Sequence, residues 1–138
     1  MLKNKTAYLE WLTHAYHDLD GAMLLFKANH YTDTTSYVLQ QAIEKMLKAI
    51  LAAQNKPIKK IHNLLEVYDL VMSDSFTLDE DDLMYLSIAT DYYTKQKYPT
   101  PHKRLPPKEE IEEVIQFANR LFNQVCTLLN IDPEEIKK

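Results

Sequence analysis

The segment from residue 37 to residue 51 decides the fold, and it reads Tyr-Val-Leu-Gln-Gln-Ala-Ile-Glu-Lys-Met-Leu-Lys-Ala-Ile-Leu. Its apolar residues recur at steps of three and four, which is the spacing of one face of an α-helix. Glu44 and Lys48 stand one helical turn apart with the acid first, the favourable order for an ion pair on a helix surface. The segment is therefore predicted to be one helix of a bundle. The residues of its apolar face are Leu39, Ala42, Ile43, Met46, Leu47 and Ile50.

The composition indicates a single all-α domain. The chain has 138 residues, which is enough for one hydrophobic core, and its only glycine is Gly21. No Asn-Gly or Gly-Asp dipeptide separates alternating runs of the kind that form a β-hairpin. Gly21 falls inside a helical pattern. It indicates either that another helix approaches closely at this position or that the helix simply tolerates a glycine, and we favour the second interpretation. We expect residues 1–138 to form one domain, with residues 131–138 as a short turn or frayed tail.

Apolar periodicity and helix-end signals predict five helices in an up-down antiparallel bundle. Either Thr32 or Asp33 is the expected N-cap of the second helix, and residues 77–80 match a capping box at the start of the fourth. Residues 94–107 contain four prolines and are predicted to form a constrained loop. The approximate helical ranges are 5–28, 33–54, 63–72, 77–91 and 107–129.

The chain is predicted to be cytoplasmic. Residues 1–6 lack the apolar core of a signal peptide, and no stretch approaches about 18 uncharged apolar residues. Cys126 is the only cysteine, so no internal disulfide is possible, and we expect it to be an inert core thiol. The net charge of −4 argues against general binding of polyanions.

Two predicted loops nevertheless concentrate positive charge. One follows the second helix and the other follows the fourth, and in an up-down bundle both should emerge at one end, opposite the acidic segment 74–82. Tyrosines 92, 93 and 98 would add rings for base stacking, so a nucleotide or single-stranded RNA is the expected ligand. A solvated loop whose tyrosines close the core is the competing interpretation. The candidate binding residues are Lys59, Lys60, Tyr93, Lys95, Tyr98 and Arg104.

The amino-acid sequence of the central helix resembles that of the HEPN domain family. Within residues 37–51 it combines a tyrosine, Gln-Gln-Ala, Glu-Lys and Leu-Lys-Ala, and Ile-His-Asn-Leu-Leu follows at 61–65. The resemblance extends from about Tyr8 to Leu129. It implies a small helical-bundle protein that forms a homodimer with a shared basic cleft. It also implies a minimal nucleotidyltransferase as partner, in a toxin-antitoxin-like pair. Candidate dimer anchors are Trp11, Tyr16 and Tyr37, and the Glu44/Lys48 pair is a further candidate at the cleft.

A second resemblance concerns residues 91–99, Asp-Tyr-Tyr-Thr-Lys-Gln-Lys-Tyr-Pro, in which Lys97 stands where the family pattern has an arginine. Nuclease branches of the family place a histidine roughly four to six residues after that arginine, and His102 has a compatible spacing. By this resemblance His102 would assist attack of a ribose 2′-hydroxyl on phosphorus, and Lys97 would stabilise the developing charge. Lysine supplies positive charge but lacks the planar fork that arginine offers a phosphate. A loop that only binds is the alternative.

The remaining motifs exclude several enzyme classes. The chain has no glycine-rich phosphate loop, paired-aspartate site or nucleophile elbow, which argues against kinases, nucleotidyltransferases and common hydrolases. His14 and His17 share a helical face, but no third metal ligand is identifiable, so neither a metal nor a cofactor is expected. His62 is expected to cap the third helix or pack against a neighbour rather than touch a ligand. The leading function is a nucleotide/RNA-binding module. A metal-independent endoribonuclease and a purely structural dimeric module are the alternatives.

Overall fold

The computed structural model describes residues 4–97 and 105–138, with the side chains of residues 95–97 left aside. Over these residues the chain forms helices and no strand, apart from one isolated bridge between Ser73 and Phe76. The predicted all-α class is confirmed, and the predicted five helices are joined by a short sixth. The helices are α1 (Lys5–Lys27), α2 (Thr32–Ala53), α3 (Leu64–Val71), α4 (Glu80–Lys97), α5 (Lys108–Leu128) and α6 (Pro133–Ile136).

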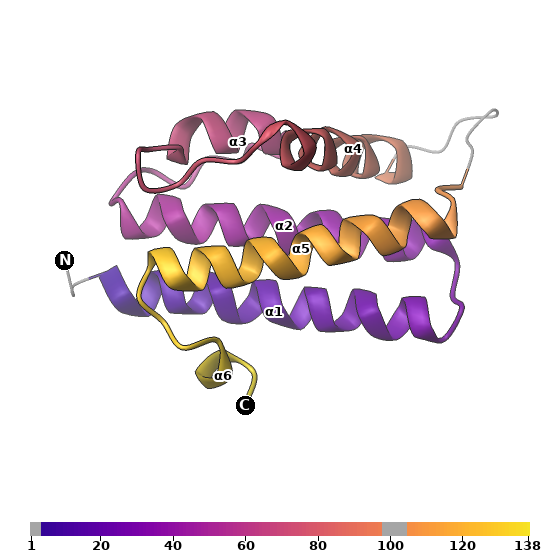
Figure 1. Cartoon of the computed structure of the whole chain (residues 1–138), viewed down its shortest axis with the longest axis horizontal. Helices are drawn as coiled ribbons and strands as arrows, with labels where there is room; N and C mark the ends of the chain where they lie inside the picture. The colour runs from indigo at the N-terminus through magenta and orange to yellow at the C-terminus, as the bar shows by residue number, and fades with distance from the viewer. Residues whose placement is uncertain (1–3, 98–104) are drawn as a thin grey trace.

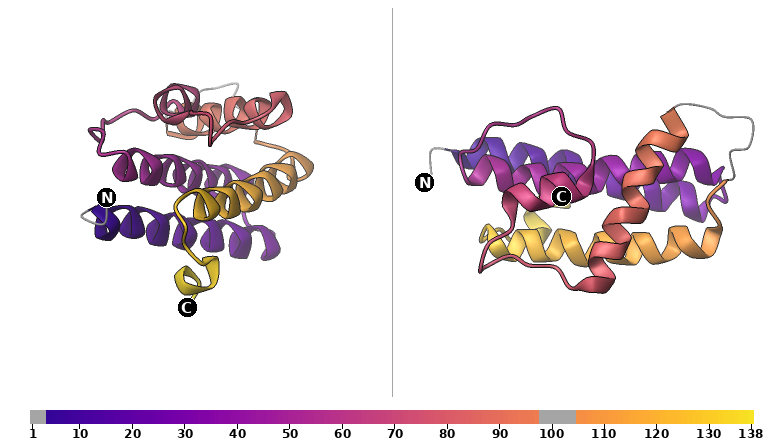
Figure 2. Two further views of the ribbon diagram at one scale, coloured as in Figure 1. Left: turned by 60° about the vertical axis from the view of Figure 1, so that its left-hand side comes forward. Right: turned by 90° about the horizontal axis from the view of Figure 1, so that it is seen from above.

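Helix α2 lies at the centre of the bundle. The long helices α1, α2 and α5 run side by side, α3 and α4 cover α2 on one side, and α6 lies beside α1 on the other (Figures 1 and 2). The apolar face predicted for residues 37–51 is confirmed, because each of its six residues is at most 1% exposed. A helix surrounded by neighbours must be apolar over most of its circumference, which is why this segment is so distinctive in the sequence.

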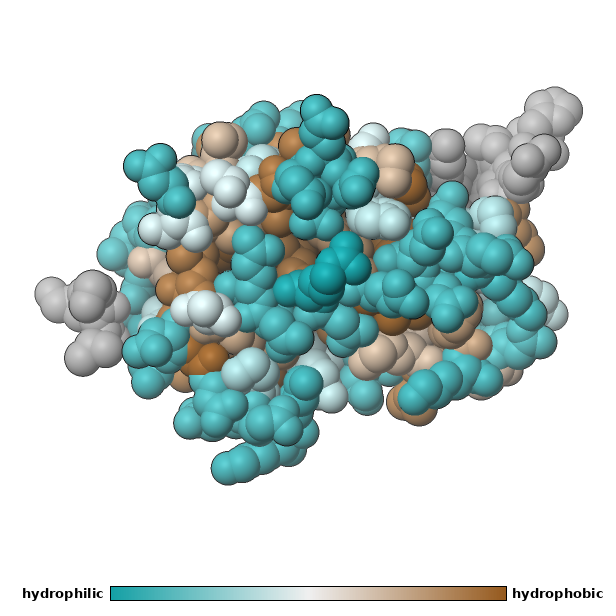
Figure 3. Space-filling model, in the orientation of Figure 1, coloured by the Kyte–Doolittle hydropathy of each residue, from teal (hydrophilic) through white to brown (hydrophobic). Residues whose placement is uncertain are grey.

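The other helices contribute one stripe each to the same core. Large buried side chains come from α1, α3 and above all α5, and Phe76 enters from the segment between α3 and α4. The visible face of the space-filling view is mainly hydrophilic, with apolar side chains showing between the polar ones (Figure 3). Among the described residues, no helix is both long enough and apolar enough to cross a membrane. The core of these elements includes Leu12, Leu19, Leu64, Val67, Val71, Ile111, Val114, Phe117, Leu121, Phe122 and Val125.

At three helix ends an asparagine occupies the left-handed position where glycine is most common. Asn29, Asn55 and Asn130 have φ angles of 60°, 58° and 58°, and each follows the C-cap of α1, α2 or α5. At each end the asparagine N–H and the next N–H donate backward to two carbonyl oxygens in the last turn, which is the Schellman pattern. Asparagine tolerates this left-handed conformation better than other residues with a Cβ. A chain with one glycine can therefore still end its helices sharply.

Several predicted boundaries are corrected by the structure. Helix α4 begins at Glu80, and the Asp79 carboxylate accepts from the Asp82 N–H at 2.8 Å, so the capping residue is Asp79 and the predicted capping box is wrong. Helix α2 has Tyr31 at its N-cap, with no side-chain cap. Helix α4 also continues to Lys97, because no proline interrupts it before position 99.

The C-terminal segment contains one short turn of helix, which is the first of the two predicted alternatives of a turn or a tail. Asp132 caps α6 by accepting from the Glu134 N–H at 3.0 Å. Ile131 and Ile136 are 8% and 7% exposed, so both side chains join the core. The sequence left a turn and a tail as alternatives because one turn is too short to show a helical period.

Candidate functional site

A row of polar side chains runs along one side of the central helix. Gln40, Glu44 and Lys48 follow one another at one-turn spacing on α2, and they are 0%, 5% and 5% exposed. The predicted surface ion pair between Glu44 and Lys48 is therefore buried. Helices α3 and α4, together with the loop before α3, cover this side of α2 (Figure 2). Buried polar groups of this kind are stable only when they are hydrogen-bonded.

Glu44 is the centre of the resulting hydrogen-bond network. Its Oε2 accepts from Lys48 Nζ at 2.7 Å. Its Oε1 accepts from Gln40 Nε2 at 3.0 Å and lies 2.9 Å from His62 Nδ1. Gln40 Nε2 also donates to the His62 carbonyl oxygen at 3.2 Å, and Gln40 Oε1 accepts from Gln41. The network therefore holds both the ring and the backbone of His62 against α2.

Glu44 is ionised and His62 donates to it through Nδ1. Burial alone raises the pKa of the Glu44 carboxyl, but the hydrogen bonds from Lys48, His62 and Gln40 outweigh burial, and the pKa lies below its ordinary value. An ionised carboxylate can only accept hydrogen bonds. The proton of a neutral His62 ring must therefore sit on Nδ1, which leaves Nε2 as an acceptor.

Three aromatic rings lie together above this network. The His62 ring stacks on Tyr93 of α4 with centroids 4.1 Å apart and planes 12° apart. Tyr93 in turn stacks with Tyr37 of α2 at 5.9 Å and 22°. The His62 side chain is 38% exposed, so the stack reaches the protein surface there. Offset ring stacks of this geometry are favourable beyond the apolar area they bury.

The loop between α2 and α3 brings His62 to this position. It doubles back along α2 before α3 begins (Figure 2). Asn63 then caps α3 by accepting from the Leu65 and Glu66 N–H groups at 3.0 and 3.2 Å. The Leu64 N–H donates to Thr90 Oγ1 of α4 at 3.1 Å. Because Asn63 is the cap, the first of the two predicted roles for His62 is wrong. The second, packing against a neighbouring helix, is confirmed.

The predicted common end for the two cationic loops is wrong. Gln54 Nε2 donates to the Val71 carbonyl oxygen at 3.1 Å and Lys56 Nζ to that of Leu70, so α2 ends beside the end of α3, just before the acidic segment 74–82. Helix α4 ends at the opposite end of the bundle, where α5 begins (Figure 1). The reason is the returning loop, after which α3 runs in the direction of α2 and α4 crosses over α2 toward the start of α5 (Figure 2). The α2–α3 loop nevertheless contacts α4, through the stacking of His62 on Tyr93.

The predicted binding and catalytic residues fall into three groups, of which the structure describes the first fully, the second by its backbone, and not the third. Lys59 and Lys60 are exposed in the loop that leads to His62, and Tyr93 is half-buried in the ring stack. The predicted catalytic Lys97 and the predicted binding residue Lys95 belong to the last turn of α4, one turn beyond Tyr93, and their side chains are not described. The other predicted residues, Tyr98, His102 and Arg104, lie outside the described residues.

Tyr92 is excluded from a stacking role. Its side chain is buried, and its hydroxyl donates to the Glu110 carboxylate of α5. Burial and that carboxylate raise the pKa of the Tyr92 phenol well above its ordinary value. Of the neighbouring tyrosines 92 and 93, only Tyr93 therefore belongs to the candidate site.

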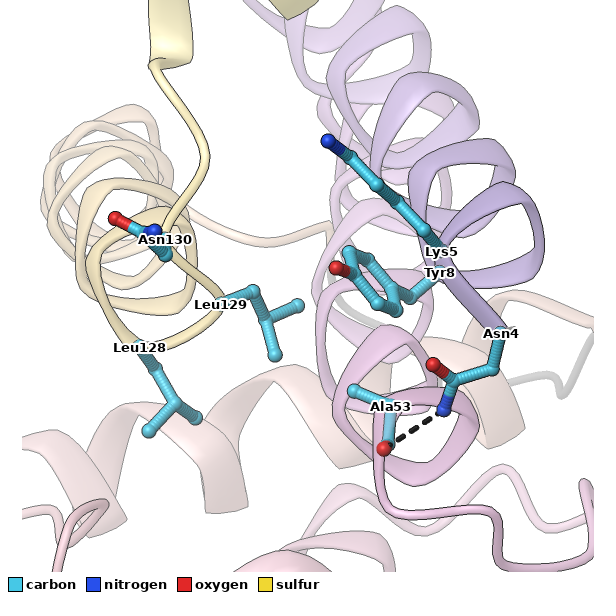
Figure 4. Close-up of a pocket in the computed structure, with 7 residues that line it drawn as sticks. All are labelled: Asn4, Lys5, Tyr8, Ala53, Leu128, Leu129 and Asn130. Atoms are coloured by element: carbon cyan, nitrogen blue, oxygen red, sulfur yellow. Dashed lines mark hydrogen bonds between the residues drawn. The ribbon is translucent and has the colours of Figure 1, made fainter. Parts of the chain in front are cut away.

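Two hollows lie elsewhere on α1. The larger, of about 380 Å³, opens where the start of α1 meets the ends of α2 and α5, and the Asn4 amide there donates to the Ala53 carbonyl oxygen at 2.8 Å (Figure 4). The smaller, of about 250 Å³, is lined by Glu10, Trp11, His14 and Lys45. The rings of His14 and His17 contact edge to face at 5.8 Å, but within the described ranges no group of three or more metal-binding side chains occurs.

Sequence reasoning missed the Glu44–His62 contact. The signal lay in the one-turn repeat of Gln40, Glu44 and Lys48 within a helix that is otherwise apolar on most sides. Three polar residues at that spacing must either face solvent or satisfy one another. Burial of the whole helix selects the second option, and the depth of α2 in the bundle was not evident from periodicity.

Comparison with known proteins identifies the family. The model of the HEPN domain matches residues 8–129. A crystal structure of TT1696 from Thermus thermophilus superposes with a TM-score of 0.71 at 24% identity, covering 86% of this chain and 94% of that one. The crystal structure of ST0689, an archaeal HEPN homologue, gives 0.68 at 21% identity, covering 88% and 96%. A search of curated proteins finds no match. The chain belongs to the HEPN domain family.

Proposed function

We propose that this HEPN protein binds a nucleotide or single-stranded RNA at the surface where the α2–α3 loop meets α4. The observation that carries the proposal is the contact of His62 with Tyr93, which joins the lysine-bearing loop to the aromatic end of α4. Exposed Lys59 and Lys60 precede His62 by three and two residues, and Lys95 and Lys97 follow Tyr93 within about one helical turn. Cationic side chains beside aromatic rings suit a ligand that carries both phosphate and base.

We further propose that the protein acts with a minimal nucleotidyltransferase in a toxin-antitoxin-like pair. Family membership supports this, together with the absence from the sequence of the phosphate loops and paired aspartates that nucleotidyl transfer requires. The partner would supply the metal-dependent chemistry, and this chain would supply ligand binding. A neighbouring gene for a small protein with Gly-Ser and Asp-x-Asp motifs, whose product co-purifies with this chain, is the expected finding.

Homodimerisation is part of the same proposal. Of the three predicted anchors, Tyr16 packs on Phe122 at 5.6 Å and Tyr37 joins the ring stack, so both already have partners within the chain. Trp11 is half-buried beside a hollow and is the best remaining anchor. Sedimentation equilibrium should give twice the monomer mass, and Trp11→Ala should shift the equilibrium toward monomer. A monomer at all concentrations would refute this part.

The binding proposal is tested with fluorescently labelled single-stranded RNA. Lys59→Ala/Lys60→Ala should weaken binding at about 50 mM salt and flatten its salt dependence, because phosphate contacts release counterions. The control is Lys137→Ala/Lys138→Ala, which changes the net charge equally at the α6 end, on the far side of α1 from α3 and α4 (Figure 1). Equal weakening by both double variants, or no binding at low salt, would refute the proposed surface.

An RNA cleavage assay on the wild-type protein and two variants distinguishes a binding module from an endoribonuclease. If the chain is an endoribonuclease, RNA should be cleaved without added metal, and His102→Ala should abolish cleavage while Lys97→Ala slows it. Intact RNA after prolonged incubation with wild-type protein supports the binding module. Cleavage that survives His102→Ala would remove that residue from the catalytic pair.

A further inference from the structure

We propose that His62 is the stacking surface for the nucleobase of the ligand, and that Glu44 is the residue that positions it. The inference rests on the proposed function and deepens it, because it names the side chain that contacts the base. From the sequence alone, Tyr92, Tyr93 and Tyr98 are the expected stacking rings. In the structure the Tyr93 ring already stacks with both His62 and Tyr37, whereas His62 is at one end of the series and its side chain is partly exposed.

The geometry of His62 is that of the last ring in a series. One face lies on Tyr93, with centroids 4.1 Å apart and planes 12° apart. Among the described residues, Tyr93 is the only aromatic ring in contact with His62, and 38% of the His62 side chain is exposed. A base placed on the other face would extend the series by one ring. Bases stack on histidine as they do on tyrosine, because each presents a flat π-face.

The imidazole packs on Tyr93 of α4 and donates to Glu44, and these two contacts leave part of the ring exposed. Asn63, not His62, caps α3. The charge of Glu44 is already balanced by Lys48 at 2.7 Å, and Gln40 gives its other oxygen a donor. The hydrogen bond from Nδ1 adds to these contacts of Glu44, and it also orients the ring. It holds the ring by its Nδ1 edge, so that the orientation of the imidazole is fixed before a ligand binds.

The ligand class follows from the surroundings. Lys59 and Lys60 lie on the exposed loop three and two residues before His62, close enough along the chain to contact a phosphate attached to the stacked nucleoside. We therefore expect a nucleoside monophosphate unit, either free or within single-stranded RNA. Stacking reads the face of a base and not its hydrogen-bonding edge, so discrimination among the four bases should be weak.

The test uses a short RNA with one 2-aminopurine, whose fluorescence falls on stacking, and a matched probe with an abasic ribose at that site. His62→Ala should weaken binding of the base-containing probe by about 5- to 100-fold and abolish the quenching. His62→Phe should keep affinity within about threefold and retain the quenching, because phenylalanine also stacks. Binding of the abasic probe should be nearly unchanged in both variants.

Glu44→Gln separates positioning from simple packing. The amide oxygen can still accept from His62, so Glu44→Gln should reduce quenching less than Glu44→Leu, which removes the acceptor. Comparing quenching at saturating probe, in samples shown folded by circular dichroism, makes the readout independent of stability. Equal quenching in Glu44→Gln, Glu44→Leu and wild type would overturn the role of Glu44.

Different results would reject the stacking role of His62 and the proposed function. If Lys59→Ala/Lys60→Ala weakens both probes while the His62 variants bind normally, the binding surface stands and the stacking role of His62 falls. If His62→Phe loses as much affinity as His62→Ala, the polar edge of the ring matters and the stacking proposal is wrong. If wild-type protein binds neither probe at low salt, the proposed function itself fails.

Discussion

The buried pair on α2 gives the sharpest prediction for stability. Replacing Lys48 by methionine keeps most of the length of the side chain and removes the ammonium that lies 2.7 Å from Glu44. The two side chains are 6% and 7% exposed, so water cannot replace the lost partner. Breaking a buried ion pair from one side costs about 3–5 kcal/mol, because it leaves an uncompensated buried charge.

The expected loss lies at the lower end, about 3 kcal/mol. Glu44 keeps two hydrogen-bond donors, Gln40 and His62, which still favour its charged form. For a chain of this size the total free energy of unfolding is roughly 7–20 kcal/mol, so the variant should still fold. With a urea dependence of about 2 kcal/mol per molar, the unfolding midpoint should fall by about 1.5 M.

The loss of unfolding free energy in Lys48→Met should depend on pH. In the wild type the pKa of Glu44 is lowered, so its contribution to stability is present above the unfolded-state pKa and is lost as pH falls through the folded value. In Lys48→Met the desolvation of the carboxyl is less well offset, so its pKa rises and the carboxyl protonates sooner. The difference in unfolding free energy between the two proteins should therefore be largest near about pH 7 and shrink toward about pH 4.

The assay is urea unfolding followed by circular dichroism at both pH values, with Lys45→Met as the matched control. Lys45 stands three residues earlier on α2 and pairs with Asp18, but those side chains are 28% and 27% exposed, so its loss should cost under about 1 kcal/mol. Glu44→Leu/Lys48→Met should recover most of the stability. A loss below about 1 kcal/mol in Lys48→Met, or a loss independent of pH, would refute the reasoning.

Four further predictions concern single positions. Gly21→Ala should stabilise the protein by about 0.5–1 kcal/mol in thermal unfolding, because an added Cβ at this mid-helix position meets no atom within 4 Å; a loss would mean the site is tighter than the structure shows. Asp79→Ala should cost about 1 kcal/mol as the cap of α4 while Thr77→Ala costs little, and the reverse order would restore the capping box. Burial raises the pKa of the Cys126 thiol to about 11, so a disulfide reagent at about pH 8 should label denatured but not native protein, and rapid native labelling would contradict this. Ile136→Ala should lower the unfolding free energy by about 2 kcal/mol, whereas a neutral result would mean α6 is not part of the core.

Local sequence signals were sufficient to predict the helices but not the direction in which each helix runs. The apolar stripe of residues 37–51 and the prolines near position 107 placed α2 and the start of α5 within a residue or two. The direction of α4 depended on the loop at 54–63, whose sequence carries no signal that it doubles back. A count of helices assumes that each connection reverses the chain, and this loop breaks the assumption. The predicted common basic end failed for that reason.

The candidate site was predictable in part for a similar reason. Lys59, Lys60 and Tyr93 were named from charge and aromatic content, which are visible residue by residue. The buried partners of His62 were not, because Glu44 and Lys48 at one-turn spacing on a helix surface are usually exposed. Only the coverage of α2 by α3 and α4 turns that pair into a buried network, and coverage is a property of the whole fold.

Different residues of the Glu44 network serve the stability of the fold and the contact with a ligand. Lys48 and Gln40 are buried and satisfy both oxygens of Glu44 without His62, so the folded state does not depend on the imidazole for charge balance. His62 is the one member that is both bound to Glu44 and exposed. Loss of Lys48 should therefore lower stability first, whereas loss of His62 should lower affinity first. The partly exposed ring of His62 is therefore the place where a ligand can contact this buried network.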